Sequence, residues 1–275
     1  MMDLYELEHL CLRMRRRILD MSLRCEGPTH LGGGLSIVEI TAALYGSVLK
    51  FDPNNPQWDD RDRFILSKGH GVLGLYTALA EVGVIDETTF LTFKQTDSHL
   101  ISHPVMNVDL GIESSNGSLG QGLSLAIGIS WGARFLGKTH HQYVLLGDGE
   151  CNEGSVWEAA MAASQMGLQN ITAIVDNNGF QSDGSTEAIM TSTSLAERWS
   201  SFGWDVSVVD GHNLDELCSA LRASPDHQQP RCIVARTVKG RGISFMENNN
   251  EWHHNRLTQA WYDKAIEELG QGFEC

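Results

Sequence analysis

Two short apolar runs separated by a helical pattern constrain the fold of this 275-residue chain more than any other feature. Residues 143–146 (Tyr-Val-Leu-Leu) and residues 171–175 (Ile-Thr-Ala-Ile-Val) have the length and composition of buried parallel strands. Between them, apolar and small residues recur at helical spacing over residues 155–167. The segment therefore predicts a strand, a helix and a second strand that lies parallel to the first.

Polar residues that can bind a metal ion follow both predicted strands. Asp148 lies in Gly147-Asp148-Gly149-Glu150, and Asn177-Asn178 comes just after the second strand. Because open parallel sheets bind ligands at the carboxyl ends of their strands, we expect Asp148 and Asn178 to lie together there. Carboxylate and amide oxygens suit Mg²⁺, which usually completes its shell with substrate phosphates and water. The pair indicates a metal-bridged diphosphate site, although each motif taken singly also resembles a turn sequence.

The rest of the chain alternates strand and helix patterns. Helices are expected in the amphipathic N-terminal segment, through residues 42–45, after Asn213 and over residues 258–269. Strands are predicted at residues 64–66, 144–146, 171–175, 206–209 and 232–238. This alternation predicts an α/β fold with a doubly wound, mainly parallel sheet and helices on both faces. We expect one domain that spans residues 1–275.

Charge and composition exclude several classes of protein. The chain has 35 acidic and 20 basic residues, a net charge of −15, whereas nucleic acids and anionic membranes select basic clusters. No apolar run approaches the length of a membrane span, and residues 1–6 lack the features of a signal peptide, so we expect a cytoplasmic protein. The six cysteines are scattered without a Cys-x-x-Cys pair, which favours reduced thiols: Cys11, Cys25, Cys151, Cys218, Cys232 and Cys275.

A competing motif lies at residues 69–74. The sequence Gly-His-Gly-Val-Leu-Gly matches the dinucleotide-binding pattern G-x-G-x-x-G, and Glu87 lies at a suitable interval for a ribose-binding acid. However, Glu87 belongs to Asp86-Glu87-Thr88-Thr89, which predicts a helix start and not the end of a second strand. Dinucleotide binding is therefore not the favoured interpretation.

The eleven histidines fall into two groups. Four lie in glycine-rich or motif-like segments, where imidazoles could donate to diphosphate oxygens and move protons near neutral pH: His30, His70, His103 and His253. Four others are interpreted as ordinary surface or half-buried residues: His140, His141, His227 and His254.

Several motifs, in order along nearly the whole chain, resemble those of transketolases, which use thiamine diphosphate. They are residues 27–34, 61–70, 117–122, 149–159 and 239–242, together with Trp252-His253 and the Gly-Asp-Gly and Asn-Asn pair described above. A usual transketolase is more than twice as long, so the chain resembles the N-terminal subunit of a split, two-chain transketolase. The resemblance implies the diphosphate-binding domain of the thiamine diphosphate-binding fold, with the pyrimidine-binding and C-terminal domains on a partner chain.

The resemblance also assigns roles to individual residues. It implies a cofactor site formed by Gly33, Lys68, His70, Gly117, Ser118, Leu119, Asp148, Gly149, Asn178, Lys239 and His253. The metal, Mg²⁺ or alternatively Ca²⁺ or Mn²⁺, would be bound by Asp148, Asn178 and the backbone carbonyl of Phe180. The catalytic residues implied on the substrate side are His30, His103 and His253. Two positions depart from the family. Some transketolases have a small hydroxyl residue in place of Gly33, and a glycine often stands in place of His254.

By this resemblance the chain is expected to transfer a two-carbon ketol unit from a ketose, as a sugar phosphate, to an aldose. The family's glutamate that activates the cofactor lies on the pyrimidine-binding domain, so activity is expected only with a C-terminal partner, in an α₂β₂ assembly. Glu153 resembles a residue that links the two cofactor sites across the dimer interface. One alternative is a non-catalytic, cofactor-binding or regulatory subunit. The other is a different thiamine diphosphate enzyme, such as a 2-oxoacid dehydrogenase component or a deoxyxylulose phosphate synthase.

Overall fold

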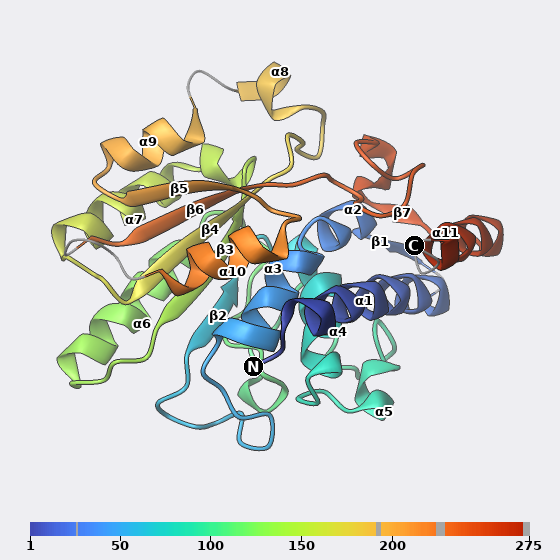
Figure 1. The fold of residues 1–275 in the computed structure, drawn as a ribbon, viewed down its shortest axis with the longest axis horizontal. Coiled ribbons are helices and arrows are strands. Elements are labelled where there is room, and N and C mark those ends of the chain that lie inside the picture. The colour runs from blue at the N-terminus through green and yellow to red at the C-terminus, as the bar shows by residue number, and fades with distance from the viewer. Residues whose placement is uncertain (26, 191–193, 224–228, 272–275) are drawn as a thin grey trace.

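A five-stranded parallel sheet forms the centre of the chain (Figure 1). The computed structural model describes residues 1–25, 27–190, 194–223 and 229–271, so His227 and Cys275 lie outside the described residues. The strand order is β2-β3-β4-β6-β5. The strands are β2 Arg63–Leu66, β3 Gln142–Gly147, β4 Ile171–Asn177, β5 Asp205–Asp210 and β6 Arg231–Arg236. The predicted α/β fold is confirmed.

Helices cover both faces of the sheet (Figure 1). Alternate strand residues point to opposite faces, so Leu145 and Ile174 belong to one buried cluster while Val144 and Val175 belong to the other. Because both faces are covered, the strands are apolar on both sides, as the sequence indicated. The first cluster packs against α1 Leu4–Arg24, α3 Val38–Ala43, α4 Val72–Glu81 and α10 Leu214–Arg222; the second packs against α6 Gly122–Phe135, α7 Gly154–Gln165 and α9 Leu195–Ser201.

Shorter elements complete the described fold. They are α2 Leu31–Leu35, α5 Glu87–Phe90, α8 Thr186–Met190, the 3₁₀ turns Gly69–Gly71, Val108–Leu110, Glu150–Asn152 and Asn250–His253, the π-helical turn Leu44–Val48, and the closing helix α11 Gln259–Gln271. Strands β1 Pro28–Thr29 and β7 Asn255–Arg256 pair antiparallel. This pairing brings the segment that leads into His30 next to the segment that follows His253 and His254.

The register of the sheet explains why the two polar motifs meet. Gly147 at the end of β3 pairs with Asp176 near the end of β4, and the Asp148 N–H donates to the Asp176 carbonyl oxygen at 3.1 Å. Asp148 and Asn178 therefore leave the sheet at the same level, as the strand–helix–strand prediction required. The intervening helix ends at Gln165, and Gly167 follows it with a φ of +59°, a conformation that glycine adopts without strain.

Two predicted boundaries were wrong. The strand predicted to end at residue 238 ends at Arg236, because the Thr237 hydroxyl donates to the Asp176 carboxylate and the Val238 N–H donates to His212. The helix predicted through residues 42–45 leaves α-helical geometry after Ala43 and continues as a π-helical turn.

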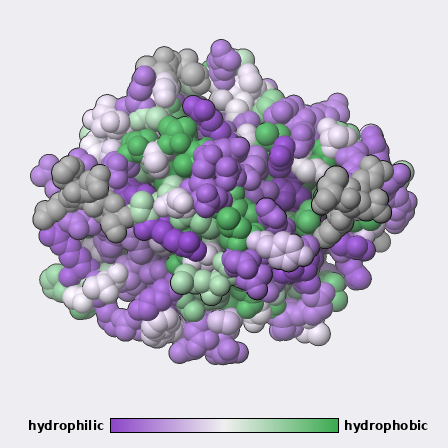
Figure 2. Space-filling model, viewed as in Figure 1, coloured by the Kyte–Doolittle hydropathy of each residue, from purple (hydrophilic) through white to green (hydrophobic). Residues whose placement is uncertain are grey.

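Other expectations agree with the fold. Glu87 begins α5, whose N-terminus Asp86 caps, so Glu87 does not end a second strand as a dinucleotide site would require. The five cysteines within the described ranges carry free thiols. None of the helices in the described part of the chain is long and apolar enough to cross a membrane. Figure 2 shows a surface that is mainly hydrophilic on the face turned to the viewer, with apolar patches between the polar residues.

Candidate functional site

A cavity of about 330 Å³ opens at the carboxyl ends of β3 and β4. It brings together most of the residues singled out from the sequence: His30, Lys68, His70, His103, Gly117, Leu119, Asp148, Gly149, Asn178, Phe180 and His253. Gly33, Ser118 and Lys239 do not line it directly, but each is adjacent to residues that do. Segments far apart in the sequence therefore converge at one place.

Asp148 is a buried carboxylate whose hydrogen bonds come from the backbone. Its Oδ1 accepts from the Gly149 N–H at 2.7 Å, and its Oδ2 accepts from the Gly179 N–H at 2.6 Å. Burial raises the pKa of Asp148 to about 7, and the neighbouring Asp176 carboxylate adds to this, while the two backbone hydrogen bonds oppose it. A divalent cation beside Asp148 would favour the charged form that burial disfavours, so the carboxylate fits the proposed role of metal ligand.

The side-chain amide of Asn178 is held in one orientation. Its Nδ2 donates to Oδ2 of Asp176 at 2.9 Å, and its Oδ1 accepts from the Phe180 N–H at 3.0 Å. Because carboxylates only accept and backbone N–H groups only donate, these two partners assign the amide oxygen and nitrogen unambiguously. Gly179 makes the turn between Asn178 and Phe180 with a φ of +77°. Asp148, Asn178 and Phe180 thus line one cavity, and each has an oxygen atom of the kind that Mg²⁺ prefers.

Asp176 is a residue of the site that the sequence reasoning missed. Its carboxylate is fully buried and accepts from Ser36 Oγ at 2.7 Å as well as from Asn178, Lys68 and Thr237. Burial alone would raise the pKa of Asp176, but the Lys68 ammonium and these hydrogen bonds hold it below its usual range. An acidic residue that ends an otherwise apolar strand just before the Asn-Asn pair was the available signal.

Two buried lysines give the site positive charge. Lys68 pairs with Asp176 and also donates to the Gly33 carbonyl oxygen at 3.2 Å. Lys239 donates to Asn250 Oδ1 at 2.7 Å and contacts Nδ1 of His253 at 2.9 Å. Burial, together with the charge of Lys68, lowers the pKa of Lys239 to about 8. Lys68 already has a counter-charge in Asp176, whereas the partners of the Lys239 ammonium named here are neutral, so a diphosphate would bring negative charge to Lys239.

The predicted substrate-side histidines form a cluster around His30. The ring centroids of His103 and His253 lie 5.4 Å and 5.6 Å from that of His30, and the ring of His70 lies at 5.8 Å. Burial is the main cause that lowers the pKa of each of these four rings, to about 3 for His30 and about 4 for His253. The imidazoles are therefore neutral at pH 7, so each can both donate and accept hydrogen bonds.

His254 was interpreted from the sequence as an ordinary surface histidine. Although its side chain is exposed, its ring lies only 4.4 Å from that of His30 at an interplanar angle of 31°. His254 also contributes to lowering the pKa of His30, His103 and His253. The structure therefore adds it to the imidazole cluster, and the signal in the sequence was its departure from the glycine that often follows the Trp-His pair in transketolases.

Glu150 is a second residue that the sequence reasoning did not assign. Its Oε1 accepts from Ser67 Oγ at 2.5 Å and from the Gly120 N–H at 2.8 Å, and its Oε2 accepts from the Gly147 N–H at 3.1 Å. Burial raises the pKa of Glu150, while these hydrogen bonds oppose the increase. Glu150 thus ties the segment that ends at Gly120 to the end of β3, which fixes the position of Gly117, Ser118 and Leu119.

The glycines of the site differ in what they permit. A Cβ added at Gly33 would approach His70 Cδ2 to 3.0 Å, and one at Gly149 would meet Gln181 Cγ at 2.6 Å, so both positions are tight within this chain. A Cβ at Gly117 would make only an ordinary contact with His103 at 3.5 Å. The chain's own packing therefore does not require glycine at position 117.

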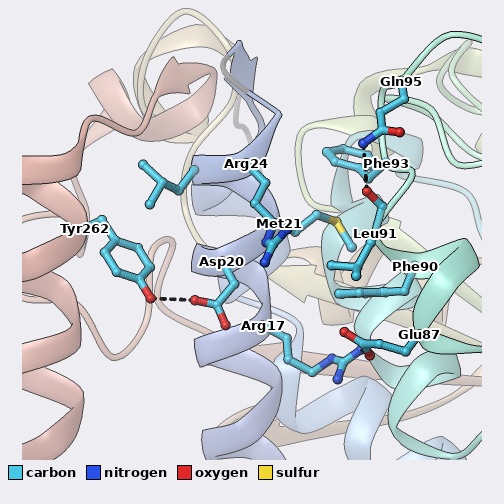
Figure 3. Close-up of a pocket in the computed structure, with 11 residues that line it drawn as sticks. Arg17, Asp20, Met21, Arg24, Glu87, Phe90, Leu91, Phe93, Gln95 and Tyr262 are labelled. Carbon is cyan, nitrogen blue, oxygen red and sulfur yellow. Dashed lines mark hydrogen bonds and ion pairs between the residues drawn. The ribbon is translucent and has the colours of Figure 1, made fainter.

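A separate cavity of about 450 Å³ lies between α1, α5 and α11 (Figure 3). Arg17 and Glu87 form an ion pair there at 2.6 Å, and the Tyr262 hydroxyl donates to Asp20 at 2.6 Å. None of the residues predicted to bind cofactor, metal or substrate lines this cavity.

Comparisons with known proteins agree with the geometry of the site. A family model described as the thiamine diphosphate binding domain of transketolase matches residues 14–274. The chain belongs to the transketolase family. It is 36% identical over 274 residues to a subunit of the apulose-4-phosphate transketolase of Phocaeicola vulgatus, and the match covers 99% of this chain and 97% of that protein. It is 41% identical over 244 residues to 6-deoxy-6-sulfo-D-fructose transketolase subunit SqwG of a Clostridium species, covering 88% and 89% of the two chains.

Solved transketolase structures have the same fold. The transketolase of Campylobacter jejuni matches with a TM-score of 0.88 and 27% identity, covering 98% of this chain and 43% of that one. This transketolase-family chain thus spans less than half of the solved protein but nearly all of its relative from Phocaeicola vulgatus. The prediction of an N-terminal subunit of a split transketolase, a transketolase-type transferase, is confirmed, and the non-catalytic and 2-oxoacid alternatives are not favoured.

Proposed function

We propose that this chain binds thiamine diphosphate through a divalent metal, Mg²⁺ in the first place and Ca²⁺ or Mn²⁺ as substitutes. The observation that carries the proposal is that Asp148, Asn178 and Phe180 line one cavity beside the buried ammonium groups of Lys68 and Lys239. Asp148, Asn178 and the Phe180 carbonyl would bind the metal, and Lys68, Lys239 and His70 would bind the diphosphate. Gly33, Gly149 and the segment Gly117-Ser118-Leu119 would contact the rest of the cofactor.

The bound cofactor supplies the carbon nucleophile and the electron sink that transfer of a two-carbon unit requires. His30, His103 and His253 would bind the hydroxyl and carbonyl groups of a ketose and move protons to and from them. Lys239 donates to Nδ1 of His253, so the proton of the neutral His253 ring lies on Nε2, where it can be donated to substrate or diphosphate. Neutral imidazoles suit hydroxyl groups, which both donate and accept hydrogen bonds.

The complete enzyme would need a C-terminal partner chain that carries the pyrimidine-binding domain. Gly117 and Ser118 would lie against the pyrimidine ring. Both are exposed in this chain, so a partner chain could cover this side of the site. Exposed Glu153 lies against Gly120, where an added Cβ would meet Glu153 Cβ at 2.8 Å. This position suits a residue that links the site to a neighbouring chain.

An apolar face on α6 and α7 supports an assembly with more than two chains, for which we propose α₂β₂. Trp131 is 55% exposed and Phe135 is 84% exposed on α6, and Met161 is exposed on α7. Apart from α6 itself, no atom in the described part of the chain lies within 4 Å of a Cβ built at Gly128 or Gly132, so a neighbouring helix could approach this face closely. A surface of this kind is typical of a helix that packs against another chain.

We propose a ketose phosphate as the donor substrate and an aldose as the acceptor. We further propose that the chain forms a single domain, acts in the cytoplasm and binds neither nucleic acid nor membrane. The names of two relatives specify an apulose 4-phosphate and a sulfofructose, both of which are sugars with an anionic end. The His30 and His103 pair favours a polyhydroxylated donor over a 2-oxoacid, since decarboxylation needs fewer proton donors around hydroxyl groups.

The proposal is tested by co-expressing the chain with its C-terminal partner and assaying ketol transfer from a panel of ketose phosphates. Activity is expected only when both chains, thiamine diphosphate and Mg²⁺ are present, and it should be lost on treatment with a chelator. Cofactor binding without turnover of any ketose would instead support the regulatory role, and release of CO₂ from a 2-oxoacid would support the oxoacid enzyme.

A further inference from the structure

Lys239 lies on a loop whose backbone is anchored on both sides of it. The loop follows β6, and the Val238 N–H just before Lys239 donates to Nε2 of His212 at 2.8 Å. The Arg241 carbonyl oxygen, two residues after Lys239, accepts from Nε of Arg15 at 3.1 Å. Two side chains from distant parts of the sequence therefore hold the loop on either side of the lysine.

A single carboxylate joins these two anchors. Glu39 Oε1 accepts from Arg15 Nη2 at 2.5 Å, and Glu39 Oε2 lies 3.0 Å from Nδ1 of His212. Because the Val238 N–H can only donate, His212 Nε2 is the acceptor and its proton is on Nδ1, which donates to Glu39. Arg15 from α1, Glu39 from α3 and His212 from the β5–α10 loop thus form one connected set, which we call the Glu39 bracket.

The Glu39 bracket is largely buried, lines a different cavity and lies outside the cofactor cavity. The side chains of Arg15, Glu39 and His212 are 7%, 9% and 8% exposed, and none of them lines the cofactor cavity. Gly242, with a φ of +94°, leaves room for Arg15, because a Cβ there would approach Arg15 Nε to 2.7 Å. On the other side of the loop, the Gly240 N–H donates to the Gly32 carbonyl oxygen at 3.1 Å.

We propose that the Glu39 bracket is a positioning set that holds Lys239 in place for the diphosphate of the cofactor. The inference rests on the proposed function, since it assumes that Lys239 contacts this diphosphate. The Lys239 ammonium sits among Asn250, His253 and the Gln181 carbonyl, and it can keep that place only while its backbone is fixed. Loss of the bracket would let the loop move and would weaken cofactor binding although no contact with the cofactor has been removed.

The test measures thiamine diphosphate affinity for the complex with the partner chain by calorimetry, in Mg²⁺. His212→Phe keeps an aromatic ring but removes the hydrogen bonds to Glu39 and Val238. It should weaken the affinity for thiamine diphosphate about tenfold, which is the effect of losing one hydrogen bond between Lys239 and the cofactor. His212→Gln, which offers one donor and one acceptor, should recover part of the loss. If wild-type complex does not bind the cofactor, the proposed function fails; if it binds and His212→Phe binds equally well, the Glu39 bracket has no positioning role.

Glu113→Gln is the matched control. Arg61 and Glu113 form another buried ion pair, with side chains 8% and 9% exposed. The Arg61 guanidinium donates to Glu113 and to the Trp58 carbonyl oxygen, so this pair braces a different part of the chain from the Lys239 loop. Glu39→Gln and Glu113→Gln should both lower thermal stability, whereas only Glu39→Gln should weaken cofactor binding. Equal losses of affinity in the two variants would reduce the role of Glu39 to general stability and overturn the proposal.

A double-mutant cycle shows whether the bracket acts through Lys239. In a Lys239→Met background, His212→Phe should cause no further loss of affinity, because the group that it positions is already absent. Additive losses would contradict the inference. If His212→Phe does not fold, Arg15→Lys replaces it in the same cycle, since a lysine can pair with Glu39 but cannot also reach the Arg241 carbonyl oxygen in the same geometry.

Discussion

Lys68 and Asp176 form an ion pair in which the two side chains are 1% and 0% exposed. Lys68 follows β2 and Asp176 lies near the end of β4, so the pair crosses over β3 and joins two strands that are not neighbours. Asp176 also orients the Asn178 amide, which makes the pair part of the wall of the proposed metal and diphosphate site. Stability and cofactor binding are therefore expected to depend on the same two residues.

Lys68→Met should destabilise the chain by about 3–5 kcal/mol, because it leaves the Asp176 carboxylate buried without its counter-charge. Chemical denaturation measures the change in the free energy of unfolding. Lys138→Met is the control: Lys138 pairs with Asp59 and Asp60 on the surface, and its loss should cost far less than loss of the buried pair. Similar changes in the free energy of unfolding for the two substitutions would show that the buried ion pair contributes no more to stability than the surface pair.

Asp148→Ala should abolish retention of thiamine diphosphate and Mg²⁺ by the complex, since it removes the only carboxylate proposed to bind the metal. Metal affinity should fall about 100-fold or more, because removal of a residue that only hydrogen-bonds to a metal ligand typically lowers metal affinity about 10–100-fold. Cofactor that co-purifies with the complex and bound metal are both measured. Asp215→Ala, at an exposed position on α10, should bind as the wild type does. Equal cofactor affinity in Asp148→Ala and wild type would refute the site assignment.

His103→Ala should retain the cofactor and lose turnover. Its ring belongs to the cluster around His30, and its side chain lies beside Gly117. Removal of a group that moves protons typically slows a reaction by about 10²–10⁴-fold. Steady-state kinetics and cofactor binding on the same preparation separate the two effects, and a variant that loses both would place His103 in the cofactor site instead.

His254→Gly restores the residue that often follows the Trp-His pair in transketolases, and it should change the apparent KM for the donor ketose. The His254 ring lies 4.4 Å from that of His30 in a tilted arrangement, and aromatic contacts contribute about 0.5–1.5 kcal/mol, which corresponds to a change of about 2–10-fold. Cofactor affinity should not change, because His254 does not line the cavity. An unchanged KM for every ketose tested would remove His254 from the substrate side.

Stability should depend on acid pH through Glu39. Burial alone would raise the pKa of Glu39, but Arg15 and His212 hold it below its ordinary value of 4.5. The folded state therefore binds the proton more weakly than the unfolded chain, so the contribution of Glu39 to stability is complete above pH 4.5 and is lost as the pH falls through the folded pKa.

The comparison of wild type with Glu39→Gln isolates this contribution. The free energy of unfolding of wild type should exceed that of Glu39→Gln by about 3–5 kcal/mol near neutral pH, as for other buried pairs that lose one partner. The difference should narrow below pH 4.5, and a difference that widened in acid would have the wrong sign.

Much of the fold could be predicted because apolar runs and helical spacing are local properties of the chain. Residues 143–146 and 171–175 are apolar on both faces, which only a sheet covered on both sides allows, and the polar residues after them had to lie at its carboxyl edge. The wrong strand boundary has a tertiary cause. The strand after Pro230 ended two residues early because Thr237 and Val238 are hydrogen-bonded to side chains from elsewhere in the fold, which no local pattern records.

The sequence by itself determined the parallel sheet, the place of Asp148 and Asn178 on it and the family, because these depend on periodicity and on motifs. Only the tertiary structure decided how Asp176 orients Asn178, how Glu150 holds the Gly120 segment, and that the exposed His254 lies against His30. It likewise brought together Arg15, Glu39 and His212, which are spread over nearly two hundred residues. Such contacts are made when the whole chain packs around its two cores, so the identity of a partner side chain cannot be read from spacing.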